Sequence, residues 1–255
     1  MRSSPVIEIL EKYKGRIIDV HAHVGPDQRF LMKGTVGEII EAYDRYGIKL
    51  GYVSSTLSLL GGCMEGNKHI LRVVRLFPDR FRGLFSLNPL YGEEIVPLLE
   101  KYVREYGFRG VKFHPQYFHL EPSEKISTNF LERLVKIKIP LMLHSYDGGV
   151  EVEKLAERFP DLTIIAYHMG GIKWRECLRR VKRYTNVYVE ISSSVTVRGF
   201  IEEAVEVLGS NRIMFGTDVP YLDPSVSLGK VLGADISEED VENILFRNAE
   251  RVLEV

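Results

Sequence analysis

The chain alternates between two patterns of apolar and polar residues. Short runs rich in Ile, Val and Phe are bounded by turn residues, which is typical of buried parallel strands. Between them lie longer stretches in which apolar residues recur every three or four positions, which is typical of helices with one buried face. The short runs predict strands at 16–20, 48–54, 81–87, 108–114, 140–144, 162–168, 186–192 and 212–216.

The longer stretches predict helices between and after these strands. Gly47 marks the end of the first of them, because glycine is common just past a helix terminus. The predicted helices are 36–46, 66–77, 93–106, a segment within 123–137, 150–159, 172–184, 199–208, 238–245 and 248–253, with a short amphipathic helix within 1–15.

Alternation of strands and helices favours a parallel sheet with right-handed crossovers. Eight such units in 255 residues fit a closed (β/α)₈ TIM barrel, an α/β fold, better than an open sheet. The sequence has no linker or low-complexity tract that would divide it. We therefore expect one domain over residues 1–255.

Composition narrows the class of partner. Hydrophobic residues make up 45% and charged residues 27%, with a net charge of −1, so nothing points to nucleic acid or an anionic membrane. No stretch approaches the ~20 apolar residues of a membrane span, and the first residues lack the apolar run of a signal peptide. Cys63 and Cys177 form no CxxC pair. We expect a cytoplasmic protein that acts on a small-molecule substrate, with a homodimer as the commonest oligomer.

Histidines gather where the predicted strands end. Asp218 follows the last strand in the same way, and His23 lies two residues beyond the first. Catalytic side chains of such barrels gather at the carboxyl ends of the strands. Alternation predicts that His144 faces the barrel axis with Met142, and His168 with Ala166. The four strand-end histidines are His21, His114, His144 and His168.

Several inward imidazoles and a carboxylate are poor core material by themselves. An unpaired buried polar group costs ~1–3 kcal/mol, and a divalent metal ion would satisfy the whole set. Imidazole nitrogen and carboxylate oxygen are common ligands of Zn²⁺, and Mn²⁺, Fe²⁺ and Ni²⁺ also accept them. A lone strand-end histidine is more often an ordinary hydrogen-bonding residue, so the prediction of one metal ion depends on the cluster.

The residues around this cluster resemble the motifs of a known superfamily. Ile18-Asp-Val-His21-Ala-His23, Leu143-His144, Tyr167-His168-Met-Gly-Gly and Phe215-Gly-Thr-Asp218 are similar to the strand-one, strand-five, strand-six and strand-eight signatures of the amidohydrolases. The segment from Gly107 to Pro115 resembles a connecting motif of the branch that includes aminocarboxymuconate-semialdehyde decarboxylase. The resemblance runs over nearly the whole chain in the right order.

The resemblance implies a role for each residue of the cluster. His114 stands where binuclear relatives place a bridging carboxylated lysine or a glutamate, and Lys112 lies one step deeper in the barrel. This departure favours one metal ion over two, although Lys112 means that a second metal ion stays possible as an alternative. His168 would lie beside the metal and touch the substrate or a bound water. The implied metal ligands are His21, His23, His144 and Asp218.

The same resemblance implies a chemistry. A divalent ion lowers the pKa of bound water towards ~7, which makes that water a nucleophile for a carbonyl carbon. Asp218 would shuttle the proton and His168 would polarise the carbonyl. His119 and Tyr146 follow strands four and five and are expected near the substrate. We interpret Glu190, inside strand seven, as an internal ion-pair partner.

Three functions remain open from the sequence. The first is a metal-dependent hydrolase of a small lactone, amide or ester. The second is a non-oxidative decarboxylase of a small carboxylic acid that uses the same site. The third is a barrel that binds a ligand or metal without catalysis. The His-x-His motif occurs in both enzyme classes, so strand one does not separate them.

Overall fold

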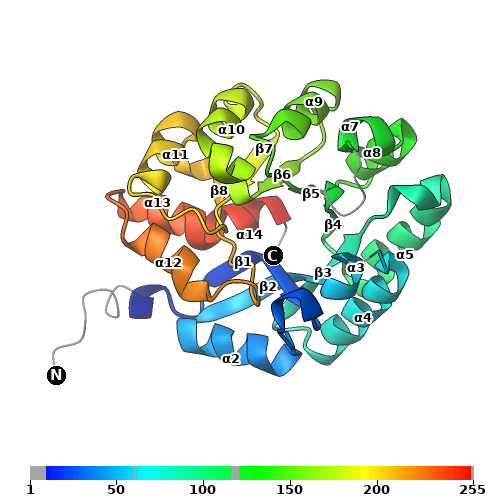
Figure 1. The fold of residues 1–255 in the computed structure, drawn as a ribbon, viewed down its shortest axis with the longest axis horizontal. Helices are drawn as coiled ribbons and strands as arrows, with labels where there is room; N and C mark the ends of the chain where they lie inside the picture. The colour runs from blue at the N-terminus through cyan, green and yellow to red at the C-terminus, as the bar shows by residue number, and fades with distance from the viewer. Residues whose placement is uncertain (1–9, 60, 116–120, 254–255) are drawn as a thin grey trace.

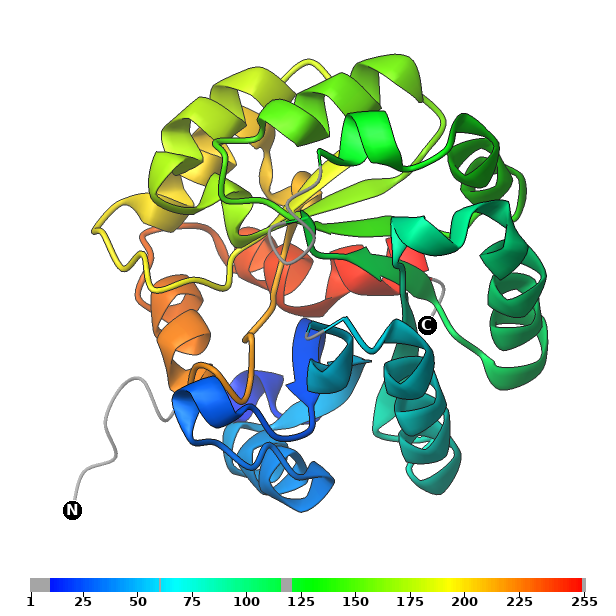
Figure 2. The ribbon, with the colours of Figure 1, turned by 45° about the vertical axis from the view of Figure 1, so that its right-hand side comes forward.

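The structure is a computed structural model that describes residues 10–59, 61–115 and 121–253. Eight parallel strands pair in sequence order, and the helices form an outer ring around them (Figures 1 and 2). The predicted (β/α)₈ class is confirmed. The strands are β1 (Ile17–Val24), β2 (Ile48–Ser55), β3 (Phe81–Ser86), β4 (Gly110–Phe113), β5 (Leu141–His144), β6 (Ile164–Tyr167), β7 (Val187–Glu190) and β8 (Ile213–Met214).

The first strand differs from its prediction in a way that matters for function. β1 continues to Val24, so His21 and His23 lie within the strand and not beyond its end. Most of the other strands are one to three residues shorter at one or both ends than predicted. Because β1 is long, its last residues stand beside the segment that follows β8.

Backbone hydrogen bonds between this segment and β1 close the barrel. The N–H of Val20 donates to the carbonyl oxygen of Phe215 at 3.0 Å, and the N–H of Asp218 donates to that of His21 at 2.8 Å. The N–H of His23 donates to the carbonyl oxygen of Val219 at 2.7 Å. Closure therefore joins two parts of the chain that are far apart in sequence and that both carry candidate ligands.

The helices follow the predicted periods closely. Thr35 and Glu38 form a capping box at the start of α2, and Gly47 ends it with φ 70°, which a glycine adopts without strain. The main helices are α2 (Val36–Tyr46), α4 (Cys63–Leu76), α5 (Val96–Tyr106), α7 (Pro122–Lys125), α8 (Thr128–Lys136), α9 (Val150–Arg158), α10 (Trp174–Val181), α11 (Phe200–Leu208), α12 (Pro224–Leu232), α13 (Glu238–Glu242) and α14 (Asn248–Leu253), with the short α3 (Thr56–Leu59) after β2.

Helix α12 was not predicted. Its sequence contains two serines and Gly229, which are weak helix formers and blur the apolar period. The helix begins at Pro224, and the carboxylate of Asp223 caps it by accepting from the N–H of Ser225. An Asp-Pro pair was therefore the available signal. Residues 10–13 are helical, whereas residues 1–9 of the predicted first helix lie outside the described residues.

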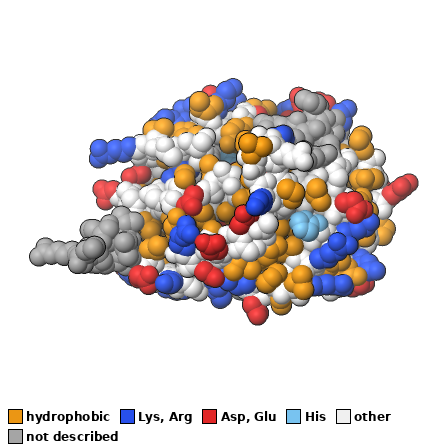
Figure 3. Space-filling view, turned by 60° about the horizontal axis from the view of Figure 1, so that its bottom comes forward, with side chains coloured by type: hydrophobic (Ala, Val, Ile, Leu, Met, Phe, Trp, Pro, Cys, Tyr) orange, Lys and Arg blue, Asp and Glu red, His pale blue; other side chains and the backbone are white. Residues whose placement is uncertain are grey.

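The outer surface matches the balanced charge of the chain. Figure 3 shows one side of the molecule, on which acidic and basic side chains are interspersed with apolar ones. Among the residues that the structure describes, no helix combines the length and apolar character needed to cross a membrane.

Candidate active site

Side chains from the two ends of the chain meet at the carboxyl end of the barrel. His21 and His23 lie on β1, and Asp218 follows β8. The Nε2 atoms of His21 and His23 are 3.1 Å apart. Oδ1 of Asp218 lies 3.4 Å from Nε2 of His21 and 3.2 Å from Nε2 of His23. The structure thus brings these three predicted site residues together at one point.

The hydrogen bonds around the imidazoles direct lone pairs towards that point. Oε2 of Glu190 lies 2.9 Å from Nδ1 of His21 and also accepts from the backbone N–H of His168. A carboxylate in this position accepts from Nδ1–H of His21, which leaves the lone pair on Nε2. Two imidazole nitrogens and a carboxylate oxygen this close repel one another unless a proton or a metal cation lies between them. The donor set therefore fits a divalent metal ion.

A second pair of imidazoles adjoins this cluster. Nδ1 of His168 lies 2.8 Å from the carbonyl oxygen of Ser192, which can only accept, so Nε2 of His168 carries the lone pair. That Nε2 is 3.1 Å from Nδ1 of His144. One donor atom from each of His21, His168 and Asp218 lies within 4.8 Å of the others, so these three residues form a His/His/Asp group that could hold a metal ion.

His168 reaches the cluster by a route that strand alternation did not predict. The ring of Tyr167 faces the barrel axis, where it stacks on His21 with ring centres 3.8 Å apart and donates its hydroxyl proton to the carbonyl oxygen of Val20. The predicted grouping of His168 with Ala166 on the inward face is therefore wrong. His168 has φ 63°, so it departs from the strand conformation and turns its ring back inward.

Asp218 shares the left-handed backbone conformation of His168. Asp218 has φ 60°, which is uncommon for a residue other than glycine. Residues held in such conformations cluster at functional sites, because the surrounding structure must compensate their cost. At Asp218 that compensation includes the N–H bond to the carbonyl oxygen of His21.

Burial sets the protonation of the cluster. It lowers the pKa of His21, His23 and His144, and it lowers the pKa of His168 to about 4. Burial by itself raises the pKa of Asp218, but the hydrogen bond from His23 and the nearby positive charges outweigh it, and the net pKa is lowered. At neutral pH the imidazoles are neutral and the carboxylate is charged, which are the forms that bind metal ions.

Glu190 has a larger part in the site than the sequence suggested. Its side chain is fully buried, and it accepts hydrogen bonds from the N–H and the hydroxyl of Ser192 as well as from His21 and His168. Burial raises the pKa of Glu190 to about 8, against the effect of these donors. A side chain on Gly216 would collide with the Glu190 carboxylate, so the glycine is needed for this arrangement. The available signal was a charged residue inside an otherwise apolar strand.

Asp19 holds the backbone and not an imidazole. Its buried carboxylate accepts from the N–H of His21 at 2.9 Å and from the N–H of Thr217 at 3.0 Å. The hydroxyl of Tyr43 donates to it at 2.7 Å. Asp19 therefore ties β1, the segment after β8 and helix α2 together directly beneath the cluster.

The two predicted residues of strand four lie at different depths. Nζ of Lys112 is 3.2 Å from Nε2 of His21 and 3.8 Å from the ring centre of Tyr167, and burial lowers the pKa of Lys112 to about 7. The ring of His114 stacks on that of His144 with centres 3.6 Å apart. Lys112 therefore touches the ligand cluster directly, whereas His114 touches it through His144.

A cavity of about 250 Å³ opens above the cluster. Tyr146 stacks on His144 with ring centres 4.9 Å apart and lies at the mouth, where it is 38% exposed. The ring of Tyr221, which also lines the cavity, packs edge-on against His23, and its hydroxyl donates to the buried carboxylate of Asp27 at 2.7 Å. The lining consists of His23, Phe30, Leu59, His114, His144, Tyr146, His168, Ser194, Asp218, Tyr221 and Leu222.

Trp174 and Cys63 lie away from this cavity. Trp174 is buried against Phe200 and does not line this cavity. The thiol of Cys63 is buried, and burial raises its pKa to about 12, which does not suit a nucleophile. His119, expected near the substrate, lies outside the described residues.

The barrel and its buried histidine–carboxylate cluster define a class: a (β/α)₈ protein with a candidate divalent-metal site at the carboxyl end of its strands. The sequence profile of the amidohydrolase family matches residues 18–255. The chain therefore belongs to the amidohydrolase family of enzymes, as its motifs suggested.

One relative matches part of the chain in sequence, and solved structures share its fold at low sequence identity. An uncharacterized protein of Aquifex aeolicus (strain VF5) is 34% identical over 100 residues, which span 38% of this chain and 44% of that protein. The 5-carboxyvanillate decarboxylase of Sphingomonas paucimobilis has 16% identity and a TM-score of 0.78, covering 95% of this chain and 100% of its own. A dihydroxybenzoic acid decarboxylase of Polaromonas sp. JS666, solved with bound manganese and the inhibitor 2-nitroresorcinol, has 19% identity and a TM-score of 0.74, covering 94% and 97%.

Proposed function

We propose that this protein is a metal-dependent, non-oxidative decarboxylase that acts on a small planar carboxylic acid, such as a hydroxylated benzoate. The observation that carries the proposal is a cavity lined both by residues of the histidine–carboxylate cluster and by a stack of three aromatic rings. Decarboxylation thereby replaces hydrolysis of a lactone, amide or ester, which the sequence put first.

The walls of the cavity suit a planar substrate. His114, His144 and Tyr146 form a stack with ring-plane angles of 24° and 16° between neighbours. Tyr221 and Phe30 also line this cavity, with their ring centres 5.3 Å apart. Flat rings prefer offset or edge-on contacts with other flat rings, so we expect this aromatic lining to favour a planar acid such as a benzoate. The decarboxylases of similar fold act on such acids, as their names say.

The metal ion would be held by His21, His23 and Asp218, completed by His144 or His168. We propose one ion, with Zn²⁺ as the first expectation from the ligand types and Mn²⁺ as the alternative found in the dihydroxybenzoic acid decarboxylase. When bound, such an ion supplies Lewis-acid polarisation of the substrate oxygens. Glu190 orients His21 for this role through Nδ1.

The chain itself must deliver one proton. Loss of CO₂ breaks the bond between the ring carbon and the carboxyl carbon, and the electron pair left on the ring carbon takes up a proton. Asp218 lines the cavity and its side chain is 17% exposed. Its carboxylate would first take up one proton from solvent, then pass that proton to the ring carbon and so return to its charged form. His168, neutral and anchored by Ser192, orients the substrate carboxylate.

Product analysis of the metal-loaded protein tests this proposal. The protein is reconstituted with Mn²⁺ or Zn²⁺, its metal content is measured by elemental mass spectrometry, and CO₂ release is followed with hydroxylated benzoates and with 5-carboxyvanillate. We expect about one ion per chain and CO₂ release that is lost in Asp218→Asn. Hydrolysis of lactones or esters without CO₂ release from any acid would restore the hydrolase hypothesis. Metal binding without either reaction would favour the binding-only barrel.

Three further expectations remain predictions: a single domain over residues 1–255, a cytoplasmic location and a homodimer. It also remains a prediction that substrate or a second metal ion is bound by Lys112, His114, His119 and Tyr146. A metal content of about two ions per chain would move Lys112 into the metal site.

A further inference from the structure

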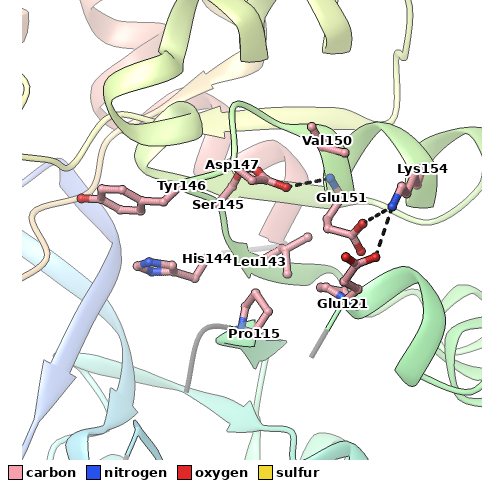
Figure 4. Close-up of a pocket in the computed structure, with 11 residues that line it drawn as sticks. Pro115, Glu121, Leu143, His144, Ser145, Tyr146, Asp147, Val150, Glu151 and Lys154 are labelled. Carbon is pink, nitrogen blue, oxygen red and sulfur yellow. Dashed lines mark hydrogen bonds and ion pairs between the residues drawn. The ribbon is translucent and has the colours of Figure 1, made fainter. Parts of the chain in front are cut away.

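A second cavity of about 370 Å³ lies beside the metal cavity, outside β5. Figure 4 shows His144 and Tyr146 on one side of it and Glu121, Glu151 and Lys154 on the opposite side. His144 and Tyr146 also line the metal cavity, so the two spaces share these two side chains as a wall. No step of the proposed reaction uses the second cavity.

The near part of this cavity is apolar. Leu143, at the end of β5, and Pro115 lie between the two sides in Figure 4, and Pro122 and Val150 complete the surface. Pro122 begins α7 and Val150 begins α9, so the cavity runs between the starts of two helices and the end of a strand. Such a surface accepts hydrocarbon without loss of hydrogen bonds.

Asp147 lies in the wall between the two ends of the cavity and is held by three hydrogen bonds. The carboxylate of Asp147 accepts from the hydroxyl of Ser145 at 3.0 Å and from the N–H groups of Gly149 and Glu151, each at 2.9 Å. These bonds cap the start of α9 and satisfy Asp147. The Asp147 carboxylate is therefore already hydrogen-bonded to the start of the helix, and we do not expect it to be the first contact of a ligand.

The far end carries more negative than positive charge. Nζ of Lys154 lies 2.7 Å from Oε1 of Glu151 and 3.4 Å from Oε2 of Glu121. Glu151 is 13% exposed at its side chain and also accepts from the N–H of Ser123, whereas Glu121 is 59% exposed. Two carboxylates share one ammonium group here, so the end of the cavity attracts cations and hydrogen-bond donors and repels anions.

We propose that this cavity is a substrate subsite that binds a tail carried by the planar acid. The tail has an apolar linker and ends in an amine or another hydrogen-bond donor. The inference deepens the proposed function, since the acid itself lies in the metal cavity. The linker would pass the shared wall at Tyr146 and contact Leu143 and Val150, and the terminal donor would meet Glu121 and Glu151.

A matched set of probes tests the subsite on the metal-loaded protein. The probes are 2,6-dihydroxybenzoate and its derivatives with a butyl, an aminobutyl or a carboxypropyl chain on the ring, each attached at either free ring position relative to the carboxylate, and their affinities are measured by calorimetry with Mn²⁺-loaded protein. We expect the better aminobutyl derivative to bind at least about 10-fold tighter than the parent, because each buried CH₂ adds affinity. The butyl derivative should gain less, and the carboxypropyl derivative should gain nothing.

Two variants locate the gain. Val150→Trp fills the apolar part and should remove the advantage of every tail, while the parent probe keeps its affinity within about 2-fold because the metal cavity is untouched. Glu121→Gln should keep the advantage of the butyl chain and reduce that of the aminobutyl chain. Glu157→Trp places the same ring on an exposed position of α9 and should leave all affinities unchanged.

The outcomes separate the subsite from the proposed reaction. Equal affinities for the parent and tailed probes, or a tail advantage that survives Val150→Trp, would overturn the subsite, even if CO₂ is released. A tail advantage that is lost in Val150→Trp supports the subsite, even if no probe releases CO₂, and the proposed reaction then fails alone. If Val150→Trp does not bind the parent probe, Glu121→Gln decides between these outcomes. Binding of no probe by the wild type counts against both.

Discussion

Two neighbouring layers of the barrel interior differ in chemistry. Leu84, Gly110 and Met142 pack together in an apolar layer, in which a side chain on Gly110 would collide with Met142. Two residues further along the same strands, towards the carboxyl end, stand Ser86, Lys112 and His144. The apolar layer is satisfied by packing alone, whereas the polar layer is satisfied by hydrogen bonds and, in the proposed function, by a metal ion. We therefore expect the apolar layer to govern stability and the polar layer to govern the proposed metal chemistry.

The largest effect should come from the polar layer. Asp218→Asn removes the proposed proton donor, so CO₂ release should fall about 10³-fold or more, while the melting temperature changes little because no packing is lost. Steady-state kinetics and a thermal scan measure the two quantities. Asp235→Asn, the same change at an exposed position, is the control. A collapse of the melting temperature in Asp218→Asn would show that the two layers are not separable.

The apolar layer should respond in the opposite way. Met142 is fully buried, and Met142→Ala should lower the free energy of unfolding by about 2–5 kcal/mol through lost contacts and a cavity. Metal content per chain should remain that of the wild type. Denaturant unfolding and elemental analysis check this pair of results. Met64→Ala, at a half-buried position on α4, should cost less. Loss of the metal at unchanged stability would contradict the division between layers.

Glu190 tests the role of the polar layer separately from substrate contact, because it contacts His21 but does not line the metal cavity. Glu190→Gln keeps the shape but weakens the bond to Nδ1 of His21, so metal affinity should fall about 10–100-fold. Competition with a chelator measures that affinity. Glu206→Gln, on the exposed side of α11, should leave it unchanged. If Glu190→Gln binds the metal as tightly as the wild type, Glu190 does not orient His21.

The smallest effect should come from the rim of the cavity. Tyr221→Phe keeps the ring that forms one wall but loses the 2.7 Å hydrogen bond to Asp27. A hydrogen bond to a charged carboxylate is worth about 1.5–3 kcal/mol to the folded protein, and we expect only part of that loss to reach the ligand, so binding of 2,6-dihydroxybenzoate should weaken by roughly 2–10-fold, with kcat nearly unchanged. Calorimetry and kinetics together test this. A large fall in kcat with unaltered binding would place Tyr221 in the chemistry itself.

Local periodicity explains what could be predicted from the sequence. The strands and most helices follow from apolar patterns that span a few residues, and α12 escaped because its serines and glycine blur that pattern. The candidate ligands His21, His23, His144, His168 and Asp218 could be recognised because strand ends are readable and similar motifs are known. The inward orientation of Tyr167 could not, because it depends on a left-handed residue after the strand.

The sequence by itself therefore determined the barrel, the amidohydrolase family and the residues that form the cluster, since these depend on short-range patterns. Only the tertiary structure decided which atoms face one another. The Glu190–His21 contact joins residues that are 169 positions apart, and closure of the barrel joins β1 to the segment after β8. The second cavity beside His144 likewise exists only where a strand end and two helix starts meet. Contacts of this kind leave no periodic trace in the sequence, because they arise from distances between elements and not from the order of residues within one.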